Sequence, residues 1–247
     1  MKAYVVAAPD ISQSFTSVYM EYRIGNGFHL YRTERSLYIR GGIMGIDCTS
    51  IDGGGKLPPL INEILKECMI HDFSGVLLEI PQSPPEILSD LAGELDSALF
   101  KDRRSLFLRE SCAKAAPHAK ILVGTALSGG SFSRHIQDHA SAFGVDRLVL
   151  DVERMRMDFL LPAKSGAGVP LGERELDELR RRYRSASFFS KDLCTYYFTY
   201  RQNGRSHFVL YDNAYSLKRK LAVAERLGVG SCFFFYPEVS DILDDII

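Results

Sequence analysis

Apolar runs alternate with amphipathic segments along most of the chain. From residue 43 onward, short apolar runs are followed by segments whose apolar side chains recur at the spacing of one helix face. Parallel strands covered by helices show this alternation, because such strands are buried on both faces. The pattern predicts strands at 43–46, 75–80, 106–108, 120–127, 147–152 and 232–236, with helices between most of them. We therefore expect an α/β fold, and the number of strands favours a closed (β/α)8 TIM barrel over an open sheet.

Two hairpins depart from this alternation. Residues 17–24 and 28–32 alternate apolar and polar side chains around Gly25-Asn26-Gly27, and residues 196–200 and 207–211 do the same around Gln202-Asn203-Gly204. Asn-Gly between two such runs is typical of a tight β-hairpin turn.

The first hairpin predicts a small antiparallel β layer over residues 1–40, placed before a barrel over residues 41–247. The second predicts a β-hairpin inserted near the C-terminus. No linker or low-complexity stretch divides the chain, so a single domain over 1–247 is expected. Either 4–8 or 43–46 could be the first barrel strand.

Composition narrows the choice of partner and compartment. The 247 residues include 30 Lys and Arg against 31 Asp and Glu, and a chain without basic excess is not expected to bind nucleic acid through its phosphates. The apolar run at the N-terminus is too short for a signal peptide or a membrane span. The five cysteines are odd in number and contain no C-x-x-C pair, so we expect reduced thiols in a cytoplasmic protein, without a metal or other cofactor.

Polar residues at the carboxyl ends of the predicted strands are the candidates for chemistry, because the loops that follow barrel strands build the site in this fold. Most charged residues in loops have no such role, so position alone is weak evidence. Tyrosines near these ends suit a half-wet cleft, because they carry both a ring and a hydroxyl. The candidate ligand contacts are Asp47, Arg109, Tyr200, Tyr211, Asp212 and Tyr236.

Two other motifs have simpler interpretations. His135 and His139 have the spacing of two zinc ligands on a helix, but no third ligand is evident, so a solvated helix face is expected. The glycine-rich run at residues 128–131 lacks the lysine of a phosphate-binding loop, which favours a tight turn between a strand and a helix.

The second hairpin also carries a resemblance to a known family. With the segments that follow, it resembles the C-terminal part of family 18 glycoside hydrolases, in particular short spore-associated members that act on peptidoglycan. The positions that fit are His207, Tyr211, Asp212, Ser216 and Lys220. The resemblance implies a TIM barrel and an amino-sugar glycan as the ligand.

Residues 72–81 fall where that family has its fourth-strand signature, FDGxDxDxE. The resemblance implies that Ser74, Leu77 and Glu79 occupy the three Asp positions and that Pro81 occupies the position of the proton-donating Glu. Proline has no proton to donate. We therefore expect a barrel that is catalytically impaired or has changed chemistry, and that binds an amino-sugar glycan or a related small molecule.

Three alternatives stay open. An active glycoside hydrolase could use Glu79, or the pair Asp151 and Glu153, which keeps the D-x-E spacing; its two carboxyl groups would lie about 5–10 Å apart. Asp151 and Glu153, together with Asp158, could also merely form ion pairs with Arg147, Arg154 and Arg156 at the barrel rim. Finally, the protein could be a scaffold without enzymatic activity, for example in spore assembly. An open acidic groove at the barrel mouth would favour an active enzyme. A mouth filled by Phe, Leu and Arg side chains would favour a scaffold protein.

Overall fold

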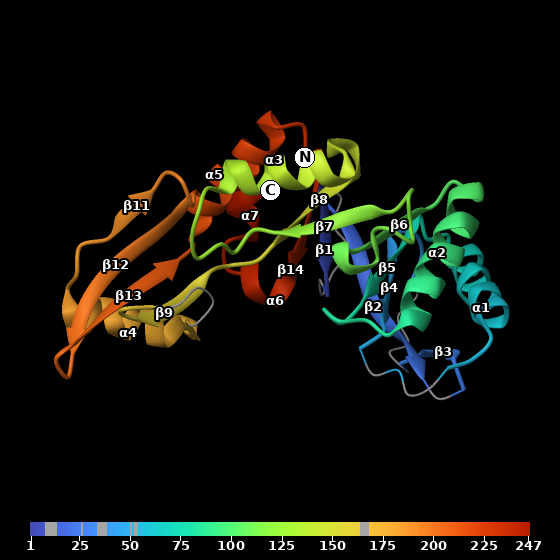
Figure 1. The fold of residues 1–247 in the computed structure, drawn as a ribbon, viewed down its shortest axis with the longest axis horizontal. Coiled ribbons are helices and arrows are strands. Elements are labelled where there is room, and N and C mark those ends of the chain that lie inside the picture. Colours follow the sequence, from blue (N-terminus) through green and yellow to red (C-terminus); the bar gives the residue numbers. More distant parts are fainter. Residues whose placement is uncertain (8–13, 26, 34–38, 50, 52–53, 164–167) are drawn as a thin grey trace.

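Eight parallel strands of the described chain close into a barrel (Figure 1). The computed structural model describes residues 1–7, 14–25, 27–33, 39–49, 51, 54–163 and 168–247. Each barrel strand pairs with its neighbours in parallel, and the last one pairs with the first. In the order around the barrel they are β1 (Lys2–Val6), β2 (Thr16–Gly25), β4 (Ile43–Asp47), β5 (Gly75–Glu79), β6 (Ser105–Arg109), β7 (Lys120–Gly124), β8 (Leu148–Val152) and β14 (Ser231–Phe235).

The barrel interior is filled by side chains. Each of the eight strands contributes one buried residue to a single apolar cluster, as is usual for barrels of this size. Within it, the Tyr4 ring stacks on Phe233 at a centroid distance of 4.7 Å and meets Phe107 edge-on at 5.2 Å. The members are Tyr4, Val18, Ile43, Leu77, Phe107, Leu122, Val149 and Phe233.

Helices and short turns cover the outside of the barrel. Each strand alternates inward and outward residues, and both sets are buried, which explains the continuous apolar runs of the sequence. None of the helices in the described ranges is long and apolar enough to span a membrane. The helices are α1 (Leu57–Ile70), α2 (Glu86–Lys101), α3 (Phe132–Phe143), α5 (Ala214–Arg226), α6 (Tyr236–Val239) and α7 (Leu243–Ile246), and the 3₁₀ turn η1 (Glu110–Cys112) follows β6.

The N-terminal hairpin is present, but most of it belongs to the barrel. The start of β2 pairs in parallel with β1, residues 18–23 pair in parallel with β4, and residues 22–25 pair antiparallel with β3 (His29–Arg32). The antiparallel extension is therefore the single strand β3, and β1 and β2 do not form a separate layer over residues 1–40. The barrel begins with β1 rather than with β4.

The C-terminal hairpin is confirmed and is part of a larger inserted sheet, which projects to the left in Figure 1. Its strands β12 and β13 turn at Asn203 and Gly204, whose φ values of 51° and 77° fit the left-handed conformation that such a turn requires. Helix α4 (Glu173–Tyr183) packs on one face. In spatial order the strands are β10 (Val169–Pro170), β9 (Arg156–Leu160), β13 (Arg205–Tyr211), β12 (Thr195–Gln202) and β11 (Phe188–Ser190).

A buried ion pair joins this sheet to the barrel. The ammonium group of Lys220 on α5 lies 2.6 Å from Oδ2 of Asp212, and both side chains are at most 1% exposed. Oδ2 also accepts a hydrogen bond from the backbone N–H of Met155, and Oδ1 accepts one from the Thr195 hydroxyl. Asp212 therefore holds together α5, the start of β12 and the connection between β8 and β9.

Removing one partner of this pair is expected to destabilise the protein strongly. Lys220→Met should lower the free energy of unfolding by about 3–5 kcal/mol, because the Asp212 carboxylate would stay buried without a counter-charge. Urea unfolding measures the loss. Lys218→Met removes an exposed ammonium from the same helix and should change stability little. Equal losses in the two variants would contradict the role of the buried pair.

Candidate functional site

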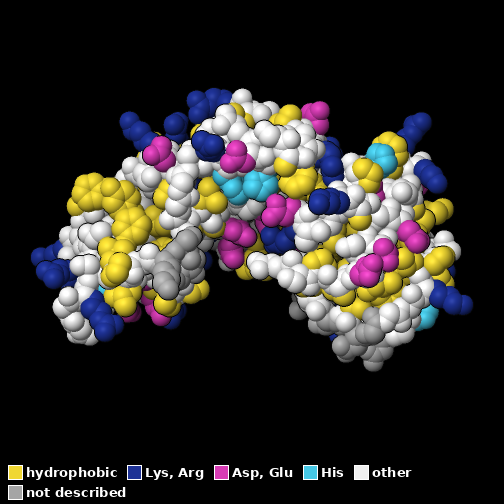
Figure 2. All heavy atoms as spheres, in the orientation of Figure 1, with side chains coloured by type: hydrophobic (Ala, Val, Ile, Leu, Met, Phe, Trp, Pro, Cys, Tyr) yellow, Lys and Arg dark blue, Asp and Glu magenta, His cyan; other side chains and the backbone are white. Residues whose placement is uncertain are grey.

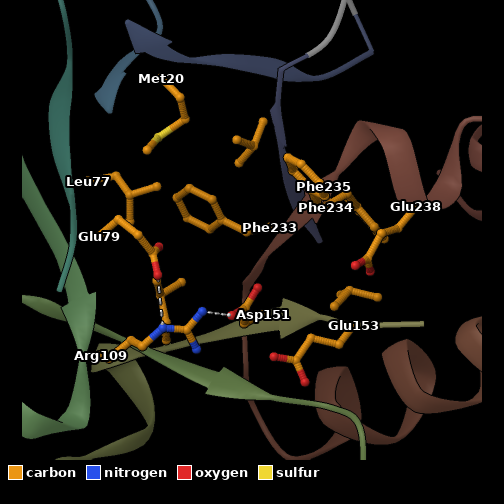
Figure 3. Close-up of a pocket in the computed structure, with 13 residues that line it drawn as sticks. Met20, Leu77, Glu79, Arg109, Asp151, Glu153, Phe233, Phe234, Phe235 and Glu238 are labelled. Atoms are coloured by element: carbon orange, nitrogen blue, oxygen red, sulfur yellow. Dashed lines mark hydrogen bonds and ion pairs between the residues drawn. The ribbon is translucent and has the colours of Figure 1, made fainter. Parts of the chain in front are cut away.

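A cavity of ≈ 320 Å³ opens at the carboxyl ends of the barrel strands (Figure 3). Its walls combine apolar side chains with four carboxylates and one guanidinium. Figure 2 shows that the face drawn there is hollowed between the inserted sheet and the barrel, with Asp and Glu side chains near the centre. The cavity is lined by Val6, Met20, Leu77, Glu79, Arg109, Leu122, Asp151, Val152, Glu153, Phe233, Phe234, Phe235 and Glu238.

Arg109 bridges two of these carboxylates. It stands at the end of β6, where its Nε lies 3.4 Å from Oε1 of Glu79 at the end of β5, and its Nη2 lies 3.0 Å from Oδ2 of Asp151 on β8. Figure 3 shows the guanidinium between the two acids. All three side chains are partly exposed, so solvent weakens the pairs relative to a fully buried bridge.

Burial dominates the titration of these acids. It raises the pKa of Glu79 above its usual value, an effect that Arg109 opposes and the Asp151 charge reinforces. Burial also raises the pKa of Asp151, and Arg109 again opposes it. Both carboxyl groups therefore hold their protons more tightly than exposed ones, and without Arg109 they would do so even more.

Glu153 lies across the cavity, next to a tight backbone contact. A Cβ atom at Gly124 would lie 3.4 Å from Oε2 of Glu153. The Thr125 hydroxyl accepts a hydrogen bond from the Glu153 N–H at 3.1 Å and lies 3.3 Å from its carbonyl oxygen, which fixes the backbone there. Burial raises the pKa of Glu153, and the neighbouring Asp151 charge raises it further. The loop after β7 thus positions this acid.

The fourth strand carries the predicted signature positions. Counted from β1, β5 is the fourth barrel strand, and Leu77 and Glu79 both line the cavity. Pro81 follows two residues after β5 and is half-buried, outside the set of residues that line the cavity. Asp151 and Glu153 stand at the end of β8, the seventh strand, so they do not occupy the fourth-strand position.

The ion pairs expected between Asp151, Glu153 and the nearby arginines are not the ones that form at the rim. The guanidinium of Arg147 donates to the carbonyl oxygens of Ala116 and Ala119, and Arg154 pairs with Asp241 at 2.7 Å. Asp151 is instead paired with Arg109, as described above.

Five of the six predicted ligand contacts lie outside the cavity lining; four of them are Tyr200, Tyr211, Asp212 and Tyr236, and the fifth is Asp47. Tyr200 is 6% exposed and donates its hydroxyl to Asp158, and Tyr211 is 4% exposed beneath α4. Asp212 forms the buried ion pair, and Tyr236 begins α6 and packs against the main core. Burial accounts for Tyr200, Tyr211 and Asp212 as parts of the core, whereas Tyr236 is partly buried and packs against it.

The Asp47 side chain forms hydrogen bonds within the loop that follows β4. Its Oδ1 accepts hydrogen bonds from the backbone N–H of Thr49 at 2.8 Å and from the Thr49 hydroxyl at 2.6 Å. It pairs in register with Glu79 but does not line the cavity.

Val6 and Met20, like Glu238 and most of the apolar lining, were not selected by the sequence analysis. Val6 and Met20 lie on β1 and β2, which the hairpin pattern placed in a separate layer. The apolar run of β1 was the available signal, because a short buried strand at the start of a barrel has that pattern.

The two histidines of α3 make local contacts. His135 Nε2 lies 3.1 Å from the carbonyl oxygen of Gly124, and His139 Nε2 lies 3.4 Å from Glu110. Burial lowers the pKa of His135, and the neighbouring His139 lowers it further. The described residues include no group of three or more His, Cys, Asp and Glu side chains arranged to hold a metal ion.

Removing the bridging guanidinium is expected to make stability depend more steeply on pH. A carboxyl group whose pKa is higher in the folded state costs stability once the pH exceeds its ordinary value. In Arg109→Met the pKa values of Glu79 and Asp151 should rise further, so the variant should lose about 1–2 kcal/mol near pH 7.5 and much less near pH 4.5.

Urea unfolding at both pH values measures this difference. Arg134→Met, which removes a guanidinium that is 81% exposed, is the control and should show no such dependence. An equal loss for Arg109→Met at both pH values would contradict the electrostatic account.

Comparisons with known proteins identify the fold. No protein-family model and no curated protein sequence matches the chain. The spore cortex-lytic enzyme SleL from Bacillus megaterium is similar with a TM-score of 0.64 at 14% identity, over 100% of this chain and 74% of that one. A class V chitinase from Nicotiana tobaccum is similar with a TM-score of 0.67 at 12% identity, over 99% of this chain and 96% of that one.

A third structure contains a sugar. A mutant GH18 chitinase from Cycas revoluta, in complex with (GlcNAc)4, has a TM-score of 0.66 at 15% identity, over 94% of this chain and 91% of that one. At these identities the likeness shows the fold alone, which is a (β/α)8 barrel that this chain shares with the three structures.

Proposed function

We propose that this barrel binds an amino-sugar glycan at its mouth without hydrolysing it. The observation that carries the proposal is the Arg109 bridge, which engages Glu79, the one acid remaining at the signature positions of the fourth strand. The residue in the position of the family's proton donor is Pro81. A family 18 mechanism needs both a proton donor and an acid that orients the acetamido group of the substrate, and Glu79 alone does not supply both.

The surroundings of Glu79 do not supply the second group that the mechanism needs. A general acid must be protonated when the substrate binds. Burial raises the pKa of Glu79, which favours the protonated form, and the guanidinium of Arg109 opposes this rise. Its neighbour on the same face of β5 is the apolar Leu77, which has no group to orient a substrate.

The cavity has the features of a small sugar site. Phe235 is 47% exposed at the mouth and offers an apolar face to a sugar ring. Carboxylates such as Glu153 and Glu238 accept hydrogen bonds, which sugar hydroxyl and amide N–H groups donate. A volume of ≈ 320 Å³ is near the lower end of ligand pockets, so the end of a glycan fits better than a long internal stretch.

Binding without turnover is the expected outcome with chitooligosaccharides and peptidoglycan fragments. Calorimetry should detect binding, and assays of new reducing ends should detect no cleavage. Phe235→Ala should weaken binding about tenfold, because it removes the exposed ring at the mouth. Phe188→Ala removes a similarly exposed ring from β11, outside the cavity, and is the matched control.

Turnover that is abolished by Glu79→Gln or Glu153→Gln would overturn the non-hydrolytic proposal. Absence of both binding and turnover would instead favour a scaffold role.

The second candidate is an active hydrolase with Glu153 as the acid. The direction of the pKa shift of Glu153 favours it, because burial makes this carboxyl group hold its proton more tightly, as suits a glycosidase's general acid facing the cavity. This candidate predicts that cleavage depends on Glu153, falls at least about a hundredfold in Glu153→Gln and persists in Asp47→Asn. A pH profile of cleavage that is unchanged in Glu153→Gln would rule it out.

The state of the cysteines supports the proposal of a cytoplasmic location. All five are free and buried, as expected for a protein in a reducing compartment.

A further inference from the structure

A second hollow, remote from the barrel mouth, lies at the C-terminal end of α4. It measures ≈ 610 Å³ and is lined by the last turn of the helix and by the segment that follows. No residue is shared between this hollow and the cavity of the barrel. We call it the arginine hollow. Its lining consists of Asp177, Arg180, Arg181, Arg184, Ser185 and Ser187.

The helix geometry turns three guanidinium groups toward one place. Arg180 and Arg184 are one helical turn apart, and Arg181 is three positions before Arg184, so all three are neighbours on the helix surface. Arg184 ends the helix with φ of 44°, in the left-handed region. The chain therefore turns sharply there, which brings Ser185 and Ser187 beside the last helical turn.

These guanidinium groups lack carboxylate partners in the described chain. Asp177 is the one acid in the lining, and it forms no ion pair with Arg180, Arg181 or Arg184. The negative end of the helix dipole favours cations here, but its partial charge of about half an elementary charge is small beside three guanidinium groups. Three guanidinium groups side by side repel one another, the single charge of Asp177 does not balance them, and a bound anion would relieve the remaining repulsion.

One arginine is already held in place. The guanidinium of Arg180 lies over the ring of Tyr211 on β13, at 5.2 Å from the ring centroid. Because this contact already restricts the Arg180 side chain, less conformational entropy is lost when that side chain binds a ligand. Tyr211, expected from the sequence to touch a ligand, instead supports a residue of the arginine hollow.

We propose that the arginine hollow binds a phosphate-type oxyanion. Guanidinium groups donate pairs of N–H groups whose fork matches two oxygens of a phosphate. The hydroxyls of Ser185 and Ser187 add donors that can reach the remaining oxygens. The phosphate can be free, carried by a sugar, or part of a lipid headgroup, and the chemistry of recognition is the same in each.

Titration of the full chain with inorganic phosphate tests the proposal. Backbone amide NMR signals of Arg184, Ser185 and Ser187 should shift and saturate at constant ionic strength. Arg181→Ala should weaken binding at least about tenfold, because it removes a charged, forked donor. Arg181→Lys should recover only part of this loss, since an ammonium keeps the charge without the fork.

Arg182 supplies a matched control. It lies in the same helical turn, contacts the ring of Tyr183 and does not line the hollow. Arg182→Ala removes the same charge and should change phosphate affinity less than about twofold. All these side chains are exposed, and circular dichroism verifies that each variant is folded. An equal loss in Arg181→Ala and Arg182→Ala, or shifts that never saturate, would overturn the proposal.

Two further binding experiments identify which molecule carries the phosphate. Glucose 6-phosphate, with glucose as its control, should bind if the group is carried by a sugar. Phosphatidylcholine vesicles with and without phosphatidylglycerol test a lipid headgroup. Binding to the anionic vesicles without any binding of inorganic phosphate or glucose 6-phosphate would show a diffusely charged surface instead of a site, and the proposal would be wrong.

Discussion

The mouth of this barrel is shaped by the packing beneath it. Closing eight parallel strands leaves an interior that side chains must fill, and one residue from each strand does so. Leu77, Leu122 and Phe233 belong to that interior cluster and also line the cavity. The top of the core is thus the floor of the site. A ligand can rest on this floor but cannot enter the barrel, so everything polar in the site has to come from the rim.

At the rim, charge is arranged around a single cation. Arg109 connects the ends of β5 and β8 by holding one acid from each, while Glu153 and Glu238 remain outside this bridge. The same contact has two effects. It stabilises two carboxylates that burial would otherwise favour in the protonated form, and it occupies the acid on the strand where glycosidases of this fold carry their catalytic pair. The site therefore combines a small, partly apolar cavity with two acids that are both paired to one arginine.

Local signals in the sequence located much of this arrangement. Among the residues selected at predicted strand ends, Glu79, Arg109, Asp151 and Glu153 line one cavity, and the others do not. The turn at Asn203-Gly204 also follows from local chemistry, because few residue pairs adopt positive φ at both positions.

Nonlocal features were beyond such reasoning. Alternation along β13 marks two faces, but it does not reveal that α4 covers the one with Tyr211. Likewise, a hairpin pattern at β2 does not reveal that the same strand also pairs in parallel with β1 and β4. The bridge made by Arg109 depends on the curvature of the closed barrel, which no short stretch of sequence encodes.

The inserted sheet leaves and rejoins the barrel at one point. The backbone N–H of Asp212 donates to the carbonyl oxygen of Met155 at 2.7 Å, so the outgoing and returning chains touch at the neck of the insert. The segment between Met155 and Asp212 therefore acts as one closed loop inserted between two barrel elements. The entropic cost of closing such a loop grows only slowly with its length. This neck is where a barrel of this kind can gain, exchange or shed a whole accessory module while its wall stays the same.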